Sequence, residues 1–259
     1  MTTTYYLEHS NLSDITSYHT LVTTNAANPA SNIRMEYLNS IHPVIADELV
    51  TEPGVPGAIT ITAVYGFLAS IWAQTDVLSN VYEITVDLLR YKTTGTIATR
   101  TVNLEFHAEP GTGKDARDYI KRGDLNGSWI TDGFTVGCRI LVAGTTWNNG
   151  SFLVQEVTAT TLTLAPFNFL SRSDIGDIEI ALGATVSTKE KQFATATGPK
   201  FSHIEQQETF TNSGNIPDET FAADDRLVVK VWVRRVSGNS DAQMVVETEG
   251  THPASVVIS

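Results

Sequence analysis

The clearest pattern along the chain is the alternation of apolar and polar side chains, which is typical of β-strands that bury one face. Residues 80–91, NVYEITVDLLRY, and residues 224–238, DDRLVVKVWVRRVSG, carry the longest alternating runs. Residues 58–73 form a third apolar run that includes three aromatic side chains, and residues 3–7 form a short strand at the start. The pattern therefore predicts long strands at both ends of the chain.

Turn-forming residues separate these runs and suggest how they are connected. The sequence TTGT follows residues 80–91, and residues 97–109 alternate again, which predicts an antiparallel hairpin with one solvated face. Near the start of the chain, Ser13 and Asp14 are good helix-capping residues. We therefore expect a brief helix over residues 15–22.

Between residues 111 and 183 the predicted strands become shorter and the turns denser. Asp132-Gly133 marks one turn, and Asn149-Gly150 suits the left-handed backbone of a hairpin turn. The runs SFLVQEV and TLTLAP then form a further hairpin. The aromatic residues expected to fill the core of this small module are Trp129, Phe134 and Phe152.

Together these elements predict an all-β fold, namely a jelly-roll-like antiparallel β-sandwich with an inserted small β domain. Residues 1–112 and 185–259 would form the discontinuous sandwich, and residues 113–184 would form the insert. Such an insertion is tolerated at a loop tip, because the two ends of a loop lie close together.

Composition limits the classes of partner. The 259 residues carry a formal net charge of −12 and are 41% apolar and 18% charged. No basic stripe is present, so direct binding to nucleic acid or to an anionic membrane is not expected. The single cysteine, Cys138, cannot form an intrachain disulfide and is expected to be buried. We see no signal peptide and no membrane span, and expect a protein made soluble in a cytoplasm.

The sequence holds no motif that carries a known chemistry. The histidines form no HExxH, HxH or i, i+4 pair, so solvated or singly hydrogen-bonded imidazoles are favoured over a scattered metal site; they are His9, His19, His42, His107, His203 and His252. The acidic pairs are more consistent with a solvated acidic surface than with the two facing carboxyl groups of a glycosidase; they are Glu105 with Glu109, Asp115 with Asp118, and Asp224 with Asp225. Gly113-Lys114 lacks the Ser or Thr of a P-loop. We therefore predict no enzymatic activity, no cofactor and no metal.

A tryptophan beside a turn is the best candidate for a partner contact. Trp147 precedes Asn148-Asn149-Gly150, and a tryptophan at a loop tip is difficult to bury. Exposed tryptophans often anchor protein partners, although core packing is an equal alternative for this residue. Trp147, Asn148, Asn149 and Phe134 make up the predicted partner-binding set.

The middle of the chain resembles a small β module found in bacteriophage virion proteins. The stretch GSWITDGFTVGCRILVAGTTWNNGSFLVQEVTATTLTL carries its Asp-Gly-Phe turn at residues 132–134, its Asn-Asn-Gly turn at 148–150 and its closing strand at 157–164. Cys138 stands where the module usually has an acidic residue. The two ends of the chain are similar to jelly-roll-like modules of phage structural proteins.

This resemblance implies a non-enzymatic structural component of a virion, assembled in the host cytoplasm. The expected role is a capsid decoration or cement protein that binds major capsid, neck or tail subunits, as a homo-oligomer and plausibly as a trimer. A tail, baseplate or fibre component that binds a host glycan is the alternative, and a glycan-cleaving enzyme is a third.

Overall fold

The computed structural model is all-β, with 64% strand and no helix among the residues that it describes, so the predicted fold class is confirmed. The described residues are 3–23, 32–35, 42–63, 67–75, 79–108, 117–166, 170, 178–202, 206–211, 216–238, 244–247 and 254–258. The chain divides into two compact units. Unit 1 is Met1–Arg90 with Phe193–Ser259, and unit 2 is Tyr91–Gln192.

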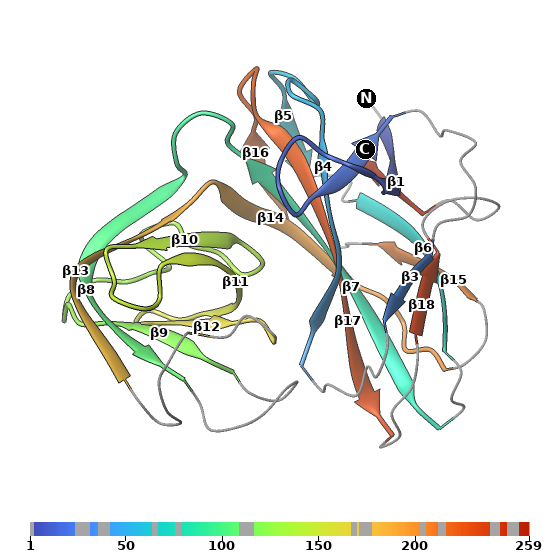
Figure 1. Ribbon diagram of the computed structural model, residues 1–259. Helices are drawn as coiled ribbons and strands as arrows, with labels where there is room; N and C mark the ends of the chain where they lie inside the picture. The colour runs from blue at the N-terminus through green and yellow to red at the C-terminus, as the bar shows by residue number, and fades with distance from the viewer. Residues whose placement is uncertain are drawn as a thin grey trace. The chain divides into compact units, whose positions relative to one another are not determined.

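Unit 1 is built around one large sheet (Figure 1). Its strands are β1 (Thr3–Leu12), β2 (His19–Val22), β3 (Asn32–Met35), β4 (Val44–Thr51), β6 (Phe67–Thr75), β7 (Val81–Tyr91), β14 (Glu190–Thr197), β15 (Gln206–Thr211), β17 (Arg226–Ser237), β18 (Met244–Glu247) and β19 (Ser255–Ile258). The order is β14-β7-β17-β4-β2-β1-β19-β6-β18-β3, and β15 pairs with β6. Strands β5 (Thr60–Ala63) and β16 (Ile216–Thr220) form a separate pair.

The centre of this sheet is buried on both faces. In β17, Leu227, Val229 and Val231 join the main core, while Val228 and Lys230 on the opposite face are also inaccessible. Strands β2 and β4 form a parallel pair, whereas β2 pairs with β1 and β4 pairs with β17 in antiparallel fashion. The β2–β4 pair brings the start of the chain beside β4.

The predicted hairpin between residues 80–91 and 97–109 is wrong. Strand β7 lies between β14 and β17, whereas β8 (Ala98–His107) pairs with strands of unit 2. The expected solvated face of β7 is buried because β17 supplies partners for its polar residues. Trp232 donates its indole N–H to Asp87 at 2.7 Å, and Arg234 forms an ion pair with Glu83.

The predicted helix over residues 15–22 is also wrong. A single turn closes when the Tyr18 N–H donates to the Ile15 carbonyl at 3.1 Å, and Ser17 then adopts a left-handed backbone with φ 74°. A left-handed residue stops a right-handed helix. The chain continues as β2, which pairs with both β1 and β4.

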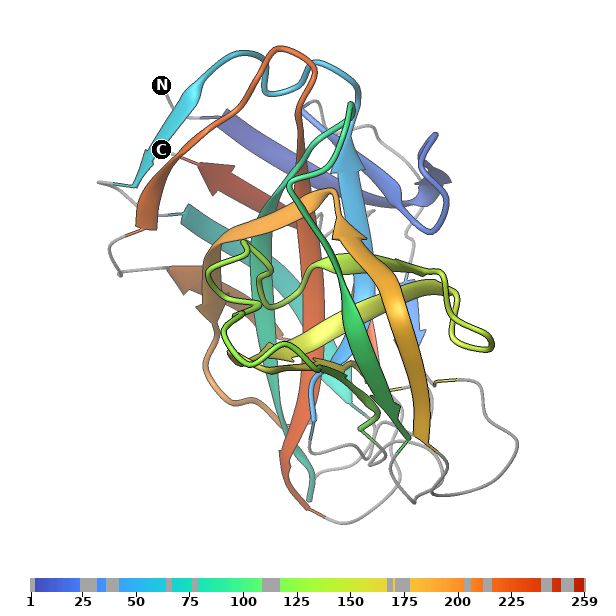
Figure 2. The same cartoon turned by 90° about the vertical axis from the view of Figure 1, so that its left-hand side faces the viewer.

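Unit 2 is a closed barrel in the order β10-β11-β12-β9-β8-β13. Besides β8, its strands are β9 (Tyr119–Arg122), β10 (Arg139–Ala143), β11 (Gly150–Val157), β12 (Thr161–Leu164) and β13 (Ile178–Thr188); they run from green to orange in Figure 2. The predicted plugs Trp129, Phe134 and Phe152 are all buried in its core, as is Cys138. Trp129 and Phe134 meet edge to face, with ring centroids 5.0 Å apart.

The boundaries of the inserted unit differ from those predicted. The compact unit begins at Tyr91 and ends at Gln192, outside the expected limits of 113 and 184. The physical reason is that β8 and β13 pair along their length and complete the barrel, so neither can belong to the sandwich. The change from long to short strands, from which the boundaries were predicted, therefore does not coincide with the boundary between the two units.

The ion pair between Asp14 and Arg226 should make unit 1 sensitive to acid. Both carboxylate oxygens accept guanidinium N–H groups at 2.6 Å. The bond from Arg226 is the main reason that the pKa of Asp14 falls from 3.8 to about 2. A lowered folded-state pKa stabilises the fold above pH 4, and this contribution is lost as the pH falls towards 2.

We expect urea-unfolding curves to show this loss directly. Because the Asp14 side chain is 64% exposed, solvent screening limits the effect to about 0.5–1 kcal/mol. Between pH 5 and pH 2 the wild-type protein should therefore lose more unfolding free energy than Asp14→Asn. Parallel losses in the two proteins would contradict the assignment.

Candidate partner-binding face and a histidine–aspartate cluster

The loop between β10 and β11 is fixed by one buried carboxylate. Glu179 of β13 accepts N–H groups from Thr146 at 2.6 Å and Trp147 at 3.3 Å, and the Asn148 amide donates to it at 2.7 Å. These bonds satisfy three donors with a single carboxylate. They hold the loop against β13.

The structure gives the four predicted partner-binding residues different roles. Trp147 is 57% exposed, so its indole is available for contact. Asn148 is buried on Glu179, and Phe134 is buried in the barrel core. Asn149 does not adopt the expected left-handed backbone; its side-chain amide bonds to both the N–H and the carbonyl of Thr145. Asn148 and Asn149 therefore shape the loop that presents Trp147.

The strand that holds this loop exposes a row of large apolar side chains. Ile178, Ile180 and Leu182 of β13 all face solvent, while Glu179 between them points inward. We call Trp147, Ile178, Ile180 and Leu182 the β13 face. Contiguous exposed apolar groups of this kind are uncommon on monomeric proteins and often mark interaction sites.

Charged and aromatic side chains border the β13 face on the neighbouring strands. Ile180 lies opposite Glu105 on β8, which pairs in turn with Lys121 of β9 at 2.9 Å. The bonds from Lys121 and then His107 lower the pKa of Glu105, so it is ionised at neutral pH. His107 stacks on Tyr119 with centroids 4.5 Å apart. The face thus has an apolar row with a polar rim, as protein interfaces do.

None of the predicted acidic pairs forms a described pair of facing carboxyl groups. Glu109 and Asp115 lie outside the described residues. Asp118 accepts the backbone N–H of Leu170 at 2.8 Å, and Asp225 accepts that of Ala222 at 2.9 Å. Asp225 also lies 3.7 Å from the Arg90 guanidinium.

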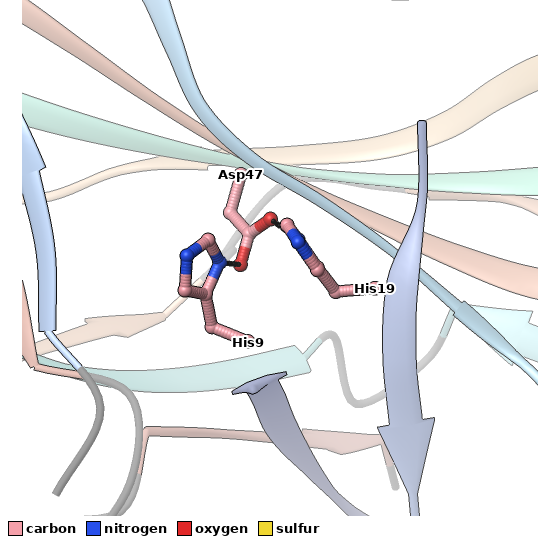
Figure 3. Close-up of side chains that lie close together, drawn as sticks. All are labelled: His9, His19 and Asp47. Atoms are coloured by element: carbon pink, nitrogen blue, oxygen red, sulfur yellow. Dashed lines mark hydrogen bonds and ion pairs between the residues drawn. The ribbon is translucent and has the colours of Figure 1, made fainter. Parts of the chain in front are cut away.

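Two histidines that show no metal-site spacing in the sequence lie on opposite sides of one buried carboxylate (Figure 3). The Nδ1 atom of His9 is 3.0 Å from Oδ2 of Asp47, and the Nδ1 atom of His19 is 2.5 Å from Oδ1. The ring centroids of His9 and His19 are 4.0 Å apart. Each imidazole is hydrogen-bonded, but the sequence did not predict that the two share one acceptor; His203 and His252 lie outside the described residues.

The hydrogen bonds keep Asp47 ionised although it is buried. Burial is the largest influence and raises its pKa, but the bonds from His19 and His9 together outweigh it and leave the pKa below 3.8. The backbone N–H of Glu48 also donates to Oδ1 at 2.9 Å. Asp47 is thus a fixed, negatively charged acceptor between two imidazoles.

Local spacing could not reveal this cluster, because Asp47 lies 28 positions from His19 and 38 from His9. The usable signal was the turn between the two histidines. Had residues 15–22 been interpreted as the second strand of a hairpin, His9 and His19 would have been expected on adjacent strands. The parallel pairing of β2 with β4, which brings in Asp47, has no local signal.

Comparisons with known proteins found no protein-family model and no curated protein that match this chain. A solved CocE/NonD family hydrolase from Staphylococcus aureus is 9% identical, with a TM-score of 0.40, and the match covers 100% of this chain and 36% of that chain. T=1 particles derived from infectious bursal virus are 12% identical, with a TM-score of 0.11, over 92% of this chain and 42% of that chain. At these TM-scores the similarities carry no argument about partners or substrates.

The hydrolase comparison nevertheless corrects one expectation. We predicted a protein without enzymatic activity, whereas a solved structure to which this chain is similar is a CocE/NonD family hydrolase, so that prediction is not retained. The absence of catalysis is therefore not part of the function proposed below. In the part of the chain that the structure describes, no helix has the length and apolar character needed to cross a membrane.

Proposed function

We propose that this chain is a structural component of a bacteriophage virion, which binds a neighbouring subunit through the β13 face. The observation that carries the proposal is the exposed row of Ile178, Ile180 and Leu182, together with the exposed Trp147 of the loop that Glu179 of the same strand holds. The resemblance of residues 127–164 to a phage virion module supports the setting, and the net charge of −12 argues against DNA as the partner.

The β13 face suits binding to a repeated lattice of subunits. Apolar side chains at its centre would lose water on contact, and the rim that includes Glu105 and Lys121 would set the orientation. In a particle with many copies, modest single contacts add up to firm attachment when several sites are engaged together. We propose capsid decoration as the role, with the major capsid protein as the partner.

The first test is the position of the chain in the particle. Virions of the phage that encodes the chain would be purified with and without its gene and reconstructed by electron microscopy. We expect density to be lost from the capsid surface. Loss from the tail would move the proposal to a tail or fibre component, and absence of the chain from purified virions would overturn it.

The second test asks whether the β13 face makes the contact. The triple variant Trp147→Ala, Ile180→Ser, Leu182→Ser should bind gene-deleted virions at least about tenfold more weakly, because large residues at the centre of an interface dominate affinity. Its unfolding free energy should change little, since all three side chains already face solvent.

A matched control removes an equally exposed apolar residue of the same unit. Leu125 is 99% exposed and lies outside the β13 face, so Leu125→Ser should bind like the wild-type protein. Binding would be measured by co-sedimentation with the virions. Equal occupancy by the wild-type protein and the triple variant would rule out the β13 face as the contact.

A further inference from the structure

We propose that His9, His19 and Asp47 form a binding site for one divalent transition-metal ion, for which Zn²⁺ is the best match. Each residue offers one ligand atom, and these three atoms lie within 4.8 Å of one another. The residues come from β1, β2 and β4, so an ion bound here would join the two N-terminal strands to the more distant β4.

Irregular pairing on two of these strands places the ligands. In β1, the register against β2 shifts between Glu8 and Leu12, and His9 lies in the unpaired stretch. In β4, the register against β17 shifts beside Asp47, where Ala46 is the extra residue. Bulges turn a side chain away from the direction that regular pleating gives it, and they are frequent at functional sites.

The ligand set has the chemistry that zinc prefers. Two imidazole nitrogens and one carboxylate oxygen form a common three-residue zinc set, which leaves a fourth position for water or another ligand. Ligands at about 2.0 Å from a tetrahedral ion lie roughly 3.3 Å apart. His9 Nδ1 lies 3.0 Å from Oδ2 of Asp47 and His19 Nδ1 lies 2.5 Å from Oδ1, so each carboxylate oxygen already faces one imidazole, and small movements would bring the ligand atoms to that spacing.

The three residues differ in exposure: the carboxylate is buried, and the two imidazoles are accessible to solvent. The side chain of Asp47 is 1% exposed, whereas those of His9 and His19 are 29% and 22% exposed. The imidazoles can therefore turn by the small amount that coordination requires, while Asp47 stays held by the Glu48 N–H. An ion would enter from the side of the histidines; each neutral imidazole would then carry its proton on Nε2, which leaves the Nδ1 lone pair for the ion.

A second histidine–carboxylate contact provides a matched comparison. His107 lies 3.0 Å from Glu105, the same distance that separates His9 from Asp47. Glu105 also binds the Lys121 ammonium at 2.9 Å, and that positive charge disfavours a cation. His107 therefore makes a histidine–carboxylate bond like that of His9, but no second imidazole is bonded to its carboxylate in the described contacts.

The test is Zn²⁺ titration of the full-length protein after treatment with a chelator. We expect one ion per chain by calorimetry, and Co²⁺ in its place should give the visible absorption of a four-coordinate nitrogen–oxygen site. His9→Gln and His19→Gln should each weaken Zn²⁺ binding by at least about 100-fold. Loss of a residue that only hydrogen-bonds to a metal ligand costs about 10–100-fold, and loss of a ligand itself should cost at least as much. His107→Gln should bind like the wild-type protein.

Each outcome decides the assignment. Both histidines are partly exposed, so their glutamine variants should fold, and circular dichroism would verify this. If the wild-type protein binds less than one ion, or if His9→Gln and His19→Gln bind as tightly as His107→Gln, the three residues are a hydrogen-bonded cluster and no metal site. Virion attachment through the β13 face does not depend on this result.

Discussion

Replacement of Lys230 by methionine should destabilise the protein by about 3–5 kcal/mol, because it leaves a buried carboxylate without its cation. The Lys230 side chain is 0% exposed, and its ammonium lies 2.8 Å from Glu48, which is 6% exposed. The two residues are direct neighbours across β17 and β4. The ammonium also lies 5.8 Å from the ring centre of Tyr18. Urea denaturation followed by circular dichroism would measure the loss.

Two further variants separate the buried charge from other effects. Lys230→Met combined with Glu48→Leu should recover most of the stability, since an apolar pair of similar volume can replace a buried ion pair. Lys121→Met removes a cation from an exposed pair, whose side chains are 46% and 32% exposed, and should cost less than about 1 kcal/mol. Similar losses in Lys230→Met and Lys121→Met would contradict this account.

Gly238→Ala should cost about 2–5 kcal/mol, because a methyl group at this position meets backbone atoms as well as an unfavourable φ. The φ of Gly238 is +92°, and an added Cβ would lie 2.7 Å from the Ser79 carbonyl oxygen and 2.8 Å from the Asn80 Cα. Asn80 is buried, and its amide donates to the Tyr82 hydroxyl at 3.1 Å, so it cannot move aside easily.

The control for backbone strain is Gly57→Ala in the same unit. Gly57 has a similar φ of +90°, but the nearest atom to an added Cβ is the Gly54 carbonyl oxygen at 3.6 Å. Gly57→Ala should therefore lower the unfolding free energy only by the cost of the unfavourable φ, about 1–2 kcal/mol. A comparison of thermal unfolding curves would show the difference, and equal losses at the two positions would mean that the chain near Gly238 relaxes.

Alternation along the chain was sufficient to predict the strand class and the core of the small module. Trp129, Phe134 and Phe152 were expected to be buried and are buried, and the β11–β12 hairpin forms where its turn residues predicted it. These predictions succeeded because a turn or an alternating strand depends on residues that are adjacent in the sequence.

Pairing partners could not be predicted in the same way. The hydrophobic pattern of β7 and β8 is compatible with a hairpin, yet each strand pairs in a different unit. Polar residues at alternate positions, such as Lys230 and Asp87, suggested a solvated face, but the structure buries them against partners from distant strands. A sequence pattern shows that a residue is polar, but it does not show whether the folded protein provides a buried hydrogen-bond or ion-pair partner for it.

The sequence alone determined that this protein is all-β, that a compact module interrupts it, and that Trp147 belongs to a turn, because these properties follow from local side-chain chemistry. Only the tertiary structure decided which strands close the barrel, which apolar side chains remain outside on β13, and that His9, His19 and Asp47 meet. The cluster depends on register shifts and on the parallel contact between β2 and β4, and the barrel depends on the pairing of β13 with β8 and β10; these contacts join residues far apart in the chain.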